Sequence, residues 1–207
     1  MMSQTIRLII TYMSRPRWAR RNVDSTCDPK CIDLLEAANK DYEVCCFTAS
    51  VQSYADAFLD FIDPDRRLIQ HRFYRDSCVE VVDEDRKLYI KDLRIFRNVH
   101  LKDILIVDNA VISFGAQLSN GIPVPSFQED KEDDEFDHLI PYLALCAKSN
   151  DVRTINRQNF HLQEMYDSPF DNWIEYYYEM DDLEILMEEE KYNHSSGKQE
   201  DKPKLNS

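Results

Sequence analysis

Short apolar runs that alternate with helical segments are the feature that most constrains the fold. The runs "YEVCCF" and "DILIVD" are apolar on both faces of an extended strand, whereas "CIDLLEAANK" and "SVQSYADAFLDFID" carry apolar residues at helical spacing. A strand that is apolar on both faces needs a cover on both faces, and helices between such strands provide it. The sequence therefore predicts an α/β domain with a mostly parallel sheet and helices on both sides.

Three further segments are expected around this sheet. "RLIQHRFYR" predicts another strand, and the runs "CVEVV" and "KLYI", separated by the polar "DEDRK", predict a small β-hairpin insertion. "HLIPYLALCAKS" predicts a helix with Pro141 near its first turn, where the missing N–H of proline is tolerated.

Composition divides the chain into four parts. Residues 171–190 hold nine Asp or Glu and no base, and residues 1–23 hold five arginines and no acid. The two segments are either solvated or attract each other or a charged partner. The predicted parts are a basic N-terminal segment (1–27), the α/β domain (28–151), an acidic and partly helical extension (152–190) and a disordered tail (191–207).

The overall charge excludes one class of function. The formal net charge of the 207 residues is -14 at pH 7. Binding to a phosphate backbone requires a clustered excess of Lys and Arg, so the charge argues against a nucleic-acid-binding protein.

The six cysteines form no zinc-like C-x-x-C pair, and Cys45 and Cys46 are adjacent, so their side chains face opposite ways in a strand. They are interpreted as reduced, mostly buried thiols. No apolar stretch approaches the roughly 20 residues that span a bilayer. A cytoplasmic or nuclear location is therefore expected, and a mitochondrial transit peptide in the Arg-rich start is the less favoured alternative.

Polar residues follow three of the predicted strands. Thr48 follows "EVCCF", Lys91 follows "LYI", and Asp108 with Asn109 follows "ILIV". In a parallel α/β sheet, ligands bind beyond the carboxyl ends of the strands. A hydroxyl, an ammonium and a carboxylate beside an amide suit a phosphate together with Mg²⁺. Taken singly, a Thr such as Thr48 at the end of a strand is usually a cap for the next helix, a "DN" pair after a strand is often a turn, and Lys91 alone is most often a solvated lysine.

The motifs carry a family resemblance. "FTAS", "YADAFLDFIDP", "HRFYRDSC", "YIKDL" and "VDN" occur in this order between Asp28 and Asp151. In this region the chain resembles the catalytic domain of the RNA polymerase II C-terminal-domain phosphatases, including the small phosphatases of that family and Dullard, within the haloacid dehalogenase (HAD) superfamily. The resemblance implies a HAD-like sheet and a protein serine/threonine phosphatase that uses Mg²⁺.

The resemblance also implies roles for particular residues. Thr48 matches the hydroxyl that holds the phosphoryl group, and Lys91 matches the lysine that balances its charge. Asp108 and Asn109 match the motif that contributes to the Mg²⁺ site. Arg75 matches an arginine close to the substrate pocket, and Arg72 is expected to help attract a phosphorylated peptide.

The chain departs from the family at its N-terminus. The reaction that the resemblance implies needs a D-x-D-x-[TV] motif after the first strand, for the nucleophile and the general acid and base, and this sequence contains none. If "IRLIIT" is the first strand, Thr11 and Met13 replace the two aspartates. If "SRPR" or "DPK" matches the turn that follows, the first strand lies upstream or has been lost. The expectation is a first strand that is missing or degenerate, and Mg²⁺ binding that is weak or absent.

Three functions are compatible with this pattern. The favoured one is a pseudophosphatase that keeps the phosphate-binding motifs, lacks catalysis and binds a phosphorylated protein or peptide. The first alternative is part of an active Mg²⁺-dependent phosphatase whose N-terminus is missing from this sequence. The second is a receptor-like subunit of the mitochondrial presequence translocase, which "FTAS" and "VDN" fit less well.

Overall fold

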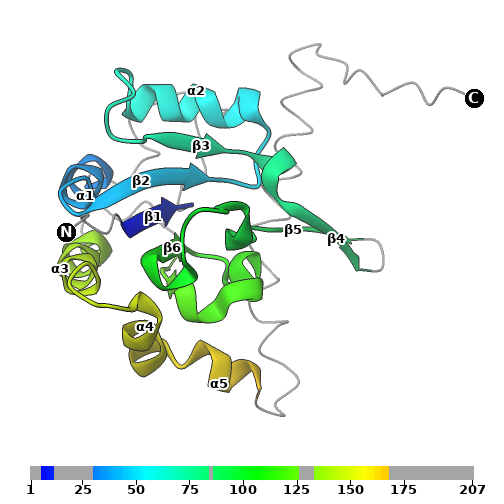
Figure 1. Ribbon diagram of the computed structural model, residues 1–207. Helices are drawn as coiled ribbons and strands as arrows, with labels where there is room; N and C mark the ends of the chain where they lie inside the picture. The colour runs from blue at the N-terminus through cyan, green and yellow to red at the C-terminus, as the bar shows by residue number, and fades with distance from the viewer. Residues whose placement is uncertain (1–5, 12–29, 84–85, 126–132, 168–207) are drawn as a thin grey trace, which may run out of the picture.

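A five-stranded parallel sheet forms the centre of the protein (Figure 1). The computed structural model describes residues 6–11, 30–83, 86–125 and 133–167. The strand order is β3-β2-β1-β6-β7, and every pairing in this sheet is parallel. The strands are β1 (Ile6–Ile10), β2 (Tyr42–Phe47), β3 (His71–Phe73), β6 (Ile104–Asp108) and β7 (Gly121–Pro123). The predicted α/β fold with a mostly parallel sheet is confirmed.

Helices and a hairpin surround this sheet. The α-helices are α1 (Cys31–Ala38), α2 (Gln52–Ile62), α3 (Glu135–Cys146), α4 (Val152–Phe160) and α5 (Leu162–Tyr166). Short 3-10 segments are η3 (Arg75–Ser77), η4 (Leu93–Ile95), η5 (Leu101–Asp103) and η6 (Val111–Asn120). The predicted hairpin is confirmed as the antiparallel pair β4 (Val79–Asp83) and β5 (Arg86–Ile90), which projects from the body of the molecule (Figure 1).

Alternate residues of each central strand enter two separate cores. Leu8 and Ile10 of β1 pack with residues of α1, α2 and α3, whereas Ile9 packs on the opposite face with residues of η4 and η6. Cys45 and Cys46 of β2 divide in the same way, as the period of two requires. Both are free thiols, and burial raises the pKa of each to about 12. This two-sided burial explains why the strands are apolar on both faces.

The structure decides between the alternatives for the first strand. Ile6–Ile10 lies at the centre of the sheet, parallel to β2 on one side and to β6 on the other. A first strand is therefore present, and the alternatives that place it upstream or regard it as lost are wrong. It is degenerate in the sense that Thr11, and no aspartate, follows it.

The folded region extends beyond the predicted bounds 28–151. Strand β1 precedes residue 28, and Val152, Ile155 and Phe160 of α4 join the same core as α1 and α3. The remaining parts of the predicted segments 1–27 and 152–190, together with the tail 191–207, lie outside the described residues. Within the described residues, no helix combines the length and the apolar character needed to cross a bilayer.

One helix start was predicted too late. Helix α3 begins at Glu135, so Pro141 lies inside the helix and not near its first turn. The first turn contains Glu135 and Asp137, whose negative charges suit the positive end of the helix dipole.

Candidate functional site

Strand register brings the predicted site residues to one edge of the sheet. Ile10 of β1 is opposite Cys46 of β2 and opposite Val107 of β6. Each strand therefore ends within about one residue of its neighbours, and the polar residues after them share the carboxyl edge. Thr11, Thr48 and Asp108 are the residues placed there by β1, β2 and β6.

The lysine and the aspartate form a buried ion pair. Lys91 Nζ lies 2.8 Å from Asp108 Oδ2, and the side chains are only 8% and 2% exposed. The same Oδ2 accepts a hydrogen bond from the Ser113 hydroxyl, and Oδ1 accepts one from the Ala110 N–H at 2.9 Å. Each partner of such a buried pair is needed by the other, because removing one leaves an uncompensated charge in a medium of low dielectric. Asn109 follows Asp108 and is half-buried.

Thr48 ends β2 without capping the next helix. Its N–H donates to the Phe73 carbonyl at 2.9 Å, which extends the pairing of β2 with β3 by one residue. Its hydroxyl oxygen accepts the Ser50 N–H at 3.1 Å, and α2 begins only at Gln52, with Val51 in the cap position. The helix-cap interpretation is therefore wrong for Thr48. The oxygen accepts one hydrogen bond within its own turn, and the hydroxyl can still donate its proton to a ligand.

Arg75 joins the loop after β2 to the hairpin. Its Nε donates to the Ala49 carbonyl at 2.7 Å, and its guanidinium carbon lies 4.9 Å from the centre of the Tyr89 ring. Cys78 lies nearby and its thiol contacts the Thr48 carbonyl at 3.8 Å. A cation stacked on an aromatic face keeps its charge while losing side-chain freedom. The arginine is therefore positioned beside the turn that contains Thr48.

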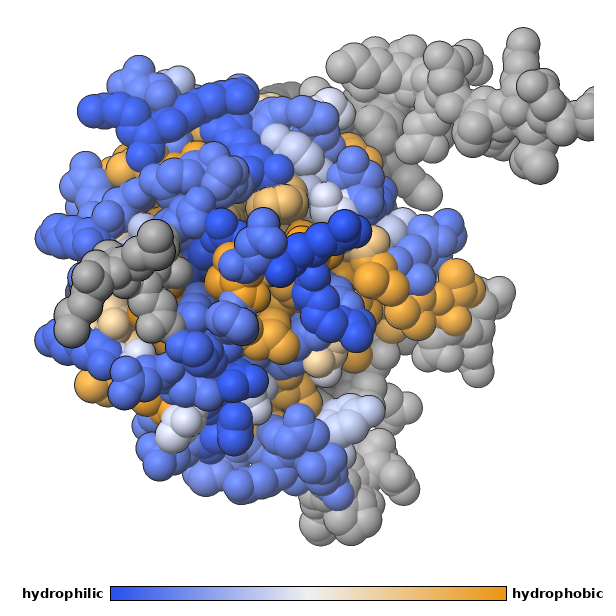
Figure 2. Space-filling model, in the orientation of Figure 1, coloured by the Kyte–Doolittle hydropathy of each residue, from blue (hydrophilic) through white to orange (hydrophobic). Residues whose placement is uncertain are grey.

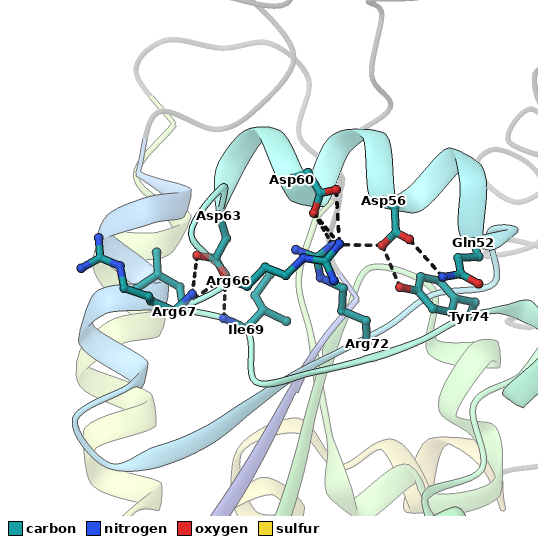
Figure 3. A network of polar contacts seen from close by, with 10 residues as sticks. Gln52, Asp56, Asp60, Asp63, Arg66, Arg67, Ile69, Arg72 and Tyr74 are labelled. Atoms are coloured by element: carbon teal, nitrogen blue, oxygen red, sulfur yellow. Dashed lines mark hydrogen bonds and ion pairs between the residues drawn. The ribbon is translucent and has the colours of Figure 1, made fainter.

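Arg72 lies in a different place from the one expected for it. Its side chain is 7% exposed beneath α2, where Nη1 contacts Asp56 at 3.0 Å and Asp60 at 2.6 Å (Figure 3). Tyr74 donates its hydroxyl to the same Asp56 at 2.7 Å. The expectation that Arg72 attracts a phosphorylated peptide is wrong, because two carboxylates of α2 already balance its charge. This network fixes β3 to α2, and η3 with Arg75 follows β3 directly.

Two side chains at this edge, Thr11 and Cys78, are poorly suited to replace the nucleophilic aspartate that the family resemblance implies. Both the hydroxyl and the N–H of Thr11 donate to the Val107 carbonyl, at 2.8 and 3.0 Å, so the side chain is turned back onto the neighbouring strand. Cys78 is a thiol and not a thiolate at neutral pH, because burial outweighs the nearby cations and raises its pKa to about 11. Neither side chain has the ionised form that attack on phosphorus requires.

The described donors do not fit Mg²⁺. This ion prefers an octahedron of oxygens and is usually bound by one or two carboxylates. At the carboxyl edge, Asp108 is the carboxylate that strands β1, β2 and β6 supply, and its two oxygens already accept three hydrogen bonds. In the part of the chain that is described, no group of three or more His, Cys, Asp or Glu side chains is arranged to hold a metal.

Sequence reasoning missed two residues that shape this site. Ser113 was not singled out, although its hydroxyl bonds both Asp108 and the Ala110 carbonyl. In the sequence, Ser113 could have been noticed only because it lies five residues after the aspartate that ends β6. Its side chain points to Asp108 because of the conformation of the intervening turn. Tyr89 was read as part of an apolar strand, and its contact with Arg75 depends on the tilt of the hairpin.

Comparisons with known proteins agree with the motif order. The family described as NLI interacting factor-like phosphatase matches residues 4–153. CTD small phosphatase-like protein 2 of Dictyostelium discoideum is 40% identical over 133 residues, which are 64% of this chain and 22% of that protein. CTD small phosphatase-like protein 3 of Caenorhabditis elegans is 39% identical over 132 residues, which are 63% of this chain and 44% of that protein.

A third relative has a name that refers to a location. CTD nuclear envelope phosphatase 1 of Xenopus tropicalis is 31% identical over 133 residues, which are 64% of this chain and 52% of that protein. The chain thus spans between about a fifth and a half of the length of these three relatives. The family match covers well over half of the chain and includes β1, β2, β5 and β6 with the residues that follow them. The chain therefore belongs to the NLI interacting factor-like phosphatase family.

Proposed function

We propose that this protein is a pseudophosphatase, which binds a phosphorylated protein and does not hydrolyse the phosphate. The observation that carries the proposal is Thr11 at the end of β1, hydrogen-bonded to the Val107 carbonyl, where the family resemblance expects a nucleophilic aspartate. Without that carboxylate the covalent route through an aspartyl-phosphate is closed. The buried Lys91–Asp108 pair has no part in chemistry and serves as a support for the pocket edge.

The binding part of the proposal rests on Thr48 and Arg75. The Thr48 hydroxyl would donate to a phosphoryl oxygen, and Arg75 would neutralise charge while it stays stacked on Tyr89. Lys91 contributes less than the resemblance implies, since Asp108 already holds its ammonium at 2.8 Å. The ligand is expected to be a phosphoserine or phosphothreonine segment of another protein, recognised without Mg²⁺. The relative named for the nuclear envelope supports a nuclear location over a cytoplasmic one.

A hydrolysis assay tests the loss of catalysis. With Mg²⁺ present, the chain is expected to release no phosphate from p-nitrophenyl phosphate or from a phosphoserine peptide. The Thr11→Asp/Met13→Asp variant restores the two carboxylates of the motif and should give measurable turnover; Met13 lies outside the described residues. Turnover by the unmodified chain that Asp108→Ala abolishes would show that the protein is an active phosphatase, which is the alternative function.

Calorimetric titration with matched peptides tests the binding. A phosphoserine peptide should bind at least about tenfold more tightly than its unphosphorylated form, because charge-assisted hydrogen bonds are worth about 1.5–3 kcal/mol. Arg75→Ala should remove most of that difference. Arg67→Ala is the control, because Arg67 is an exposed arginine in the loop after α2. Equal affinity for the two peptides would contradict the proposal.

A further inference from the structure

The β4–β5 hairpin carries four apolar side chains on one face, and the Asp83–Arg86 pair next to the turn continues that face. In the antiparallel register, Val79 is opposite Ile90 and Val81 is opposite Leu88, so these four side chains share one face. Val79 and Val81 are 48% and 41% exposed. Figure 2 shows hydrophobic residues gathered over β4 and β5 on the surface of the molecule. We call this set of four residues the hairpin face.

The opposite side of the hairpin has a different character. There Glu80 and Lys87 form an ion pair at 3.1 Å, and Tyr89 lies under the guanidinium of Arg75. Lys91, which continues β5 on the same side, reaches the buried Asp108. The polar side therefore belongs to the candidate site, and nothing in that site accounts for the apolar residues of the hairpin face.

A cover on the hairpin face would stabilise this two-stranded ribbon further. Isolated hairpins are marginally stable in water, and they become stable when a third strand or a helix packs on their hydrophobic face. An amphipathic helix fits such a face because it offers an apolar stripe along one side and polar groups along the other. An element that suits the hairpin face is therefore a helix with an apolar stripe.

The charged residues in and after β5 favour a helix of one sign of charge. Residues 86–102, which contain β5 and the segment after it, carry six Lys or Arg and one Asp, although the whole chain has a net charge of -14. Four of these cations, those of residues 87, 91, 94 and 102, each contact a carboxylate, so the positive excess that a partner meets is smaller than this count. Arg94 and Arg97, beside the hairpin in sequence, are exposed. An acidic helix would therefore be attracted to this region and a basic one repelled.

One segment of the same chain has both properties. Residues 171–190 carry nine acidic residues and no base, and an apolar stripe recurs there at steps of three or four residues. The stripe consists of Trp173, Tyr177, Met180, Leu183 and Met187. The structural description ends at residue 167, so this segment lies outside it.

The last described helix and the hairpin contact the same segment of the chain. Helix α5 ends at Tyr166, and both α5 and β5 pack against η6. Leu162 of α5 joins the core on this side of the sheet, with Leu93 and Phe114. Residues 167–170 then span at most about 15 Å, and a helix over 171–190 would be about 30 Å long, so the segment can reach the hairpin without a long linker.

We propose that residues 171–190 form an amphipathic helix that packs on the hairpin face of the same chain. Its apolar stripe covers Val79, Val81, Leu88 and Ile90, and its acidic side faces the basic residues within 86–102. The polar side of the hairpin, with Tyr89 and Arg75, stays open to the candidate site. The proposal does not depend on the proposed function, because it involves the opposite side of the hairpin.

Hydrogen exchange of the full chain, followed by mass spectrometry, tests this contact. Amides of 171–190 are expected to exchange at least about tenfold more slowly than an unstructured peptide. Val81→Ser should increase their exchange about tenfold, since it removes apolar area from the hairpin face. Val82→Ser is the matched control: the same change at the next residue of β4, also exposed, on the polar side. It should leave residues 171–190 unchanged.

A second variant keeps the test valid if Val81→Ser disturbs the hairpin itself. Leu183→Ser changes only the segment, and it should speed exchange at amides of 79–90. Three results would overturn the proposal: no protection of 171–190 in the unmodified chain, equal effects of Val81→Ser and Val82→Ser, or no response of 79–90 to Leu183→Ser. Protection that disappears on dilution together with a dimeric mass would instead assign the hairpin face to a second copy of the chain.

Discussion

At the scale of single residues, the Lys91–Asp108 pair limits what the carboxyl edge of the sheet can bind. Asp108 receives the lysine ammonium, the Ser113 hydroxyl and the Ala110 N–H, so its charge is compensated entirely by the protein. In this arrangement the carboxylate is a structural acceptor. Thr11, and no carboxylate, follows β1, so we expect this single compensated aspartate to bind a divalent cation weakly.

Breaking this pair should destabilise the fold. Lys91→Met leaves a buried carboxylate without its cation, and we expect a loss of about 3–5 kcal/mol in the free energy of unfolding, measured by urea denaturation. Lys87→Met is the control, because its pair with Glu80 is exposed and should contribute little. The double variant Lys91→Met/Asp108→Asn should regain part of the loss. Similar losses for Lys91→Met and Lys87→Met would contradict the structural role.

The sequence predicted part of this site, for a physical reason. Thr48 and Asp108 were recognisable because residues after parallel strands meet at one edge, whatever the details of the loops. The hydrogen bonds of Ser113 and the Tyr89–Arg75 stack depend on turn geometry and hairpin tilt, which local pattern does not encode. Arg72 was misplaced for a related reason: it lies inside β3, where alternate side chains point to opposite faces and only the register shows which face.

At the scale of elements, a polar network holds α2 against β3. Asp56 accepts hydrogen bonds from Arg72, Tyr74 and Gln52, all drawn in Figure 3. Arg72 Nη2 is buried and has no hydrogen-bond partner, so the guanidinium depends on the carboxylates that contact its other terminal nitrogen. Burial raises the pKa of Asp56, but the hydrogen bonds and the Arg72 charge outweigh it and lower the pKa overall.

The loss of this carboxylate should have a pH-dependent cost. Asp56→Asn is expected to cost about 2–3 kcal/mol at pH 7, the contribution of hydrogen bonds to a charged group. Because the folded pKa of Asp56 lies below its unfolded value of about 3.9, its stabilisation is complete above that pH. It is lost as the pH falls through the folded pKa. The difference in the free energy of unfolding between the unmodified chain and Asp56→Asn, measured by urea denaturation, should therefore shrink as the pH falls below about 4.

Asp65→Asn serves as the control for this experiment. Asp65 lies in the loop after α2 and pairs with Arg67 at 3.4 Å, with both side chains mostly exposed. Its replacement should change stability little at any pH. If the difference in unfolding free energy between Asp56→Asn and the unmodified chain stays constant down to pH 3, the charge of Asp56 does not hold α2 against β3.

Elements were predicted well where burial alone defines them. β2 and β6 are apolar on both faces because each side of the sheet has its own core, and this signal is visible without any structure. The start of α3 was missed because its first turn is acidic and exposed, and its stability comes from Phe136 and Leu139 packing on the core. The position of β1 was ambiguous because the motif that normally marks its end is absent.

At the scale of the whole molecule, charge is distributed unevenly. The chain has a net charge of -14, while residues 86–102, which include Lys91 and adjoin the candidate site, carry an excess of five positive charges. Under the proposed function, a phosphorylated peptide with further acidic residues should therefore be repelled at long range and attracted at short range. These two effects respond differently to salt, because the screening length falls from about 30 Å at 0.01 M to about 8 Å at 0.15 M.

The association rate of an acidic phosphopeptide should therefore rise with salt. Between about 0.01 and 0.15 M, salt screens the distant repulsion more than the close contacts at the candidate site, so we expect the rate constant to increase a few-fold. Stopped-flow fluorescence anisotropy with a labelled phosphoserine peptide measures it. A peptide of the same length with lysines in place of its acidic residues should show the opposite trend. If the acidic peptide instead associates more slowly as salt increases, the basic residues near the pocket govern its approach, and the net charge of the chain does not.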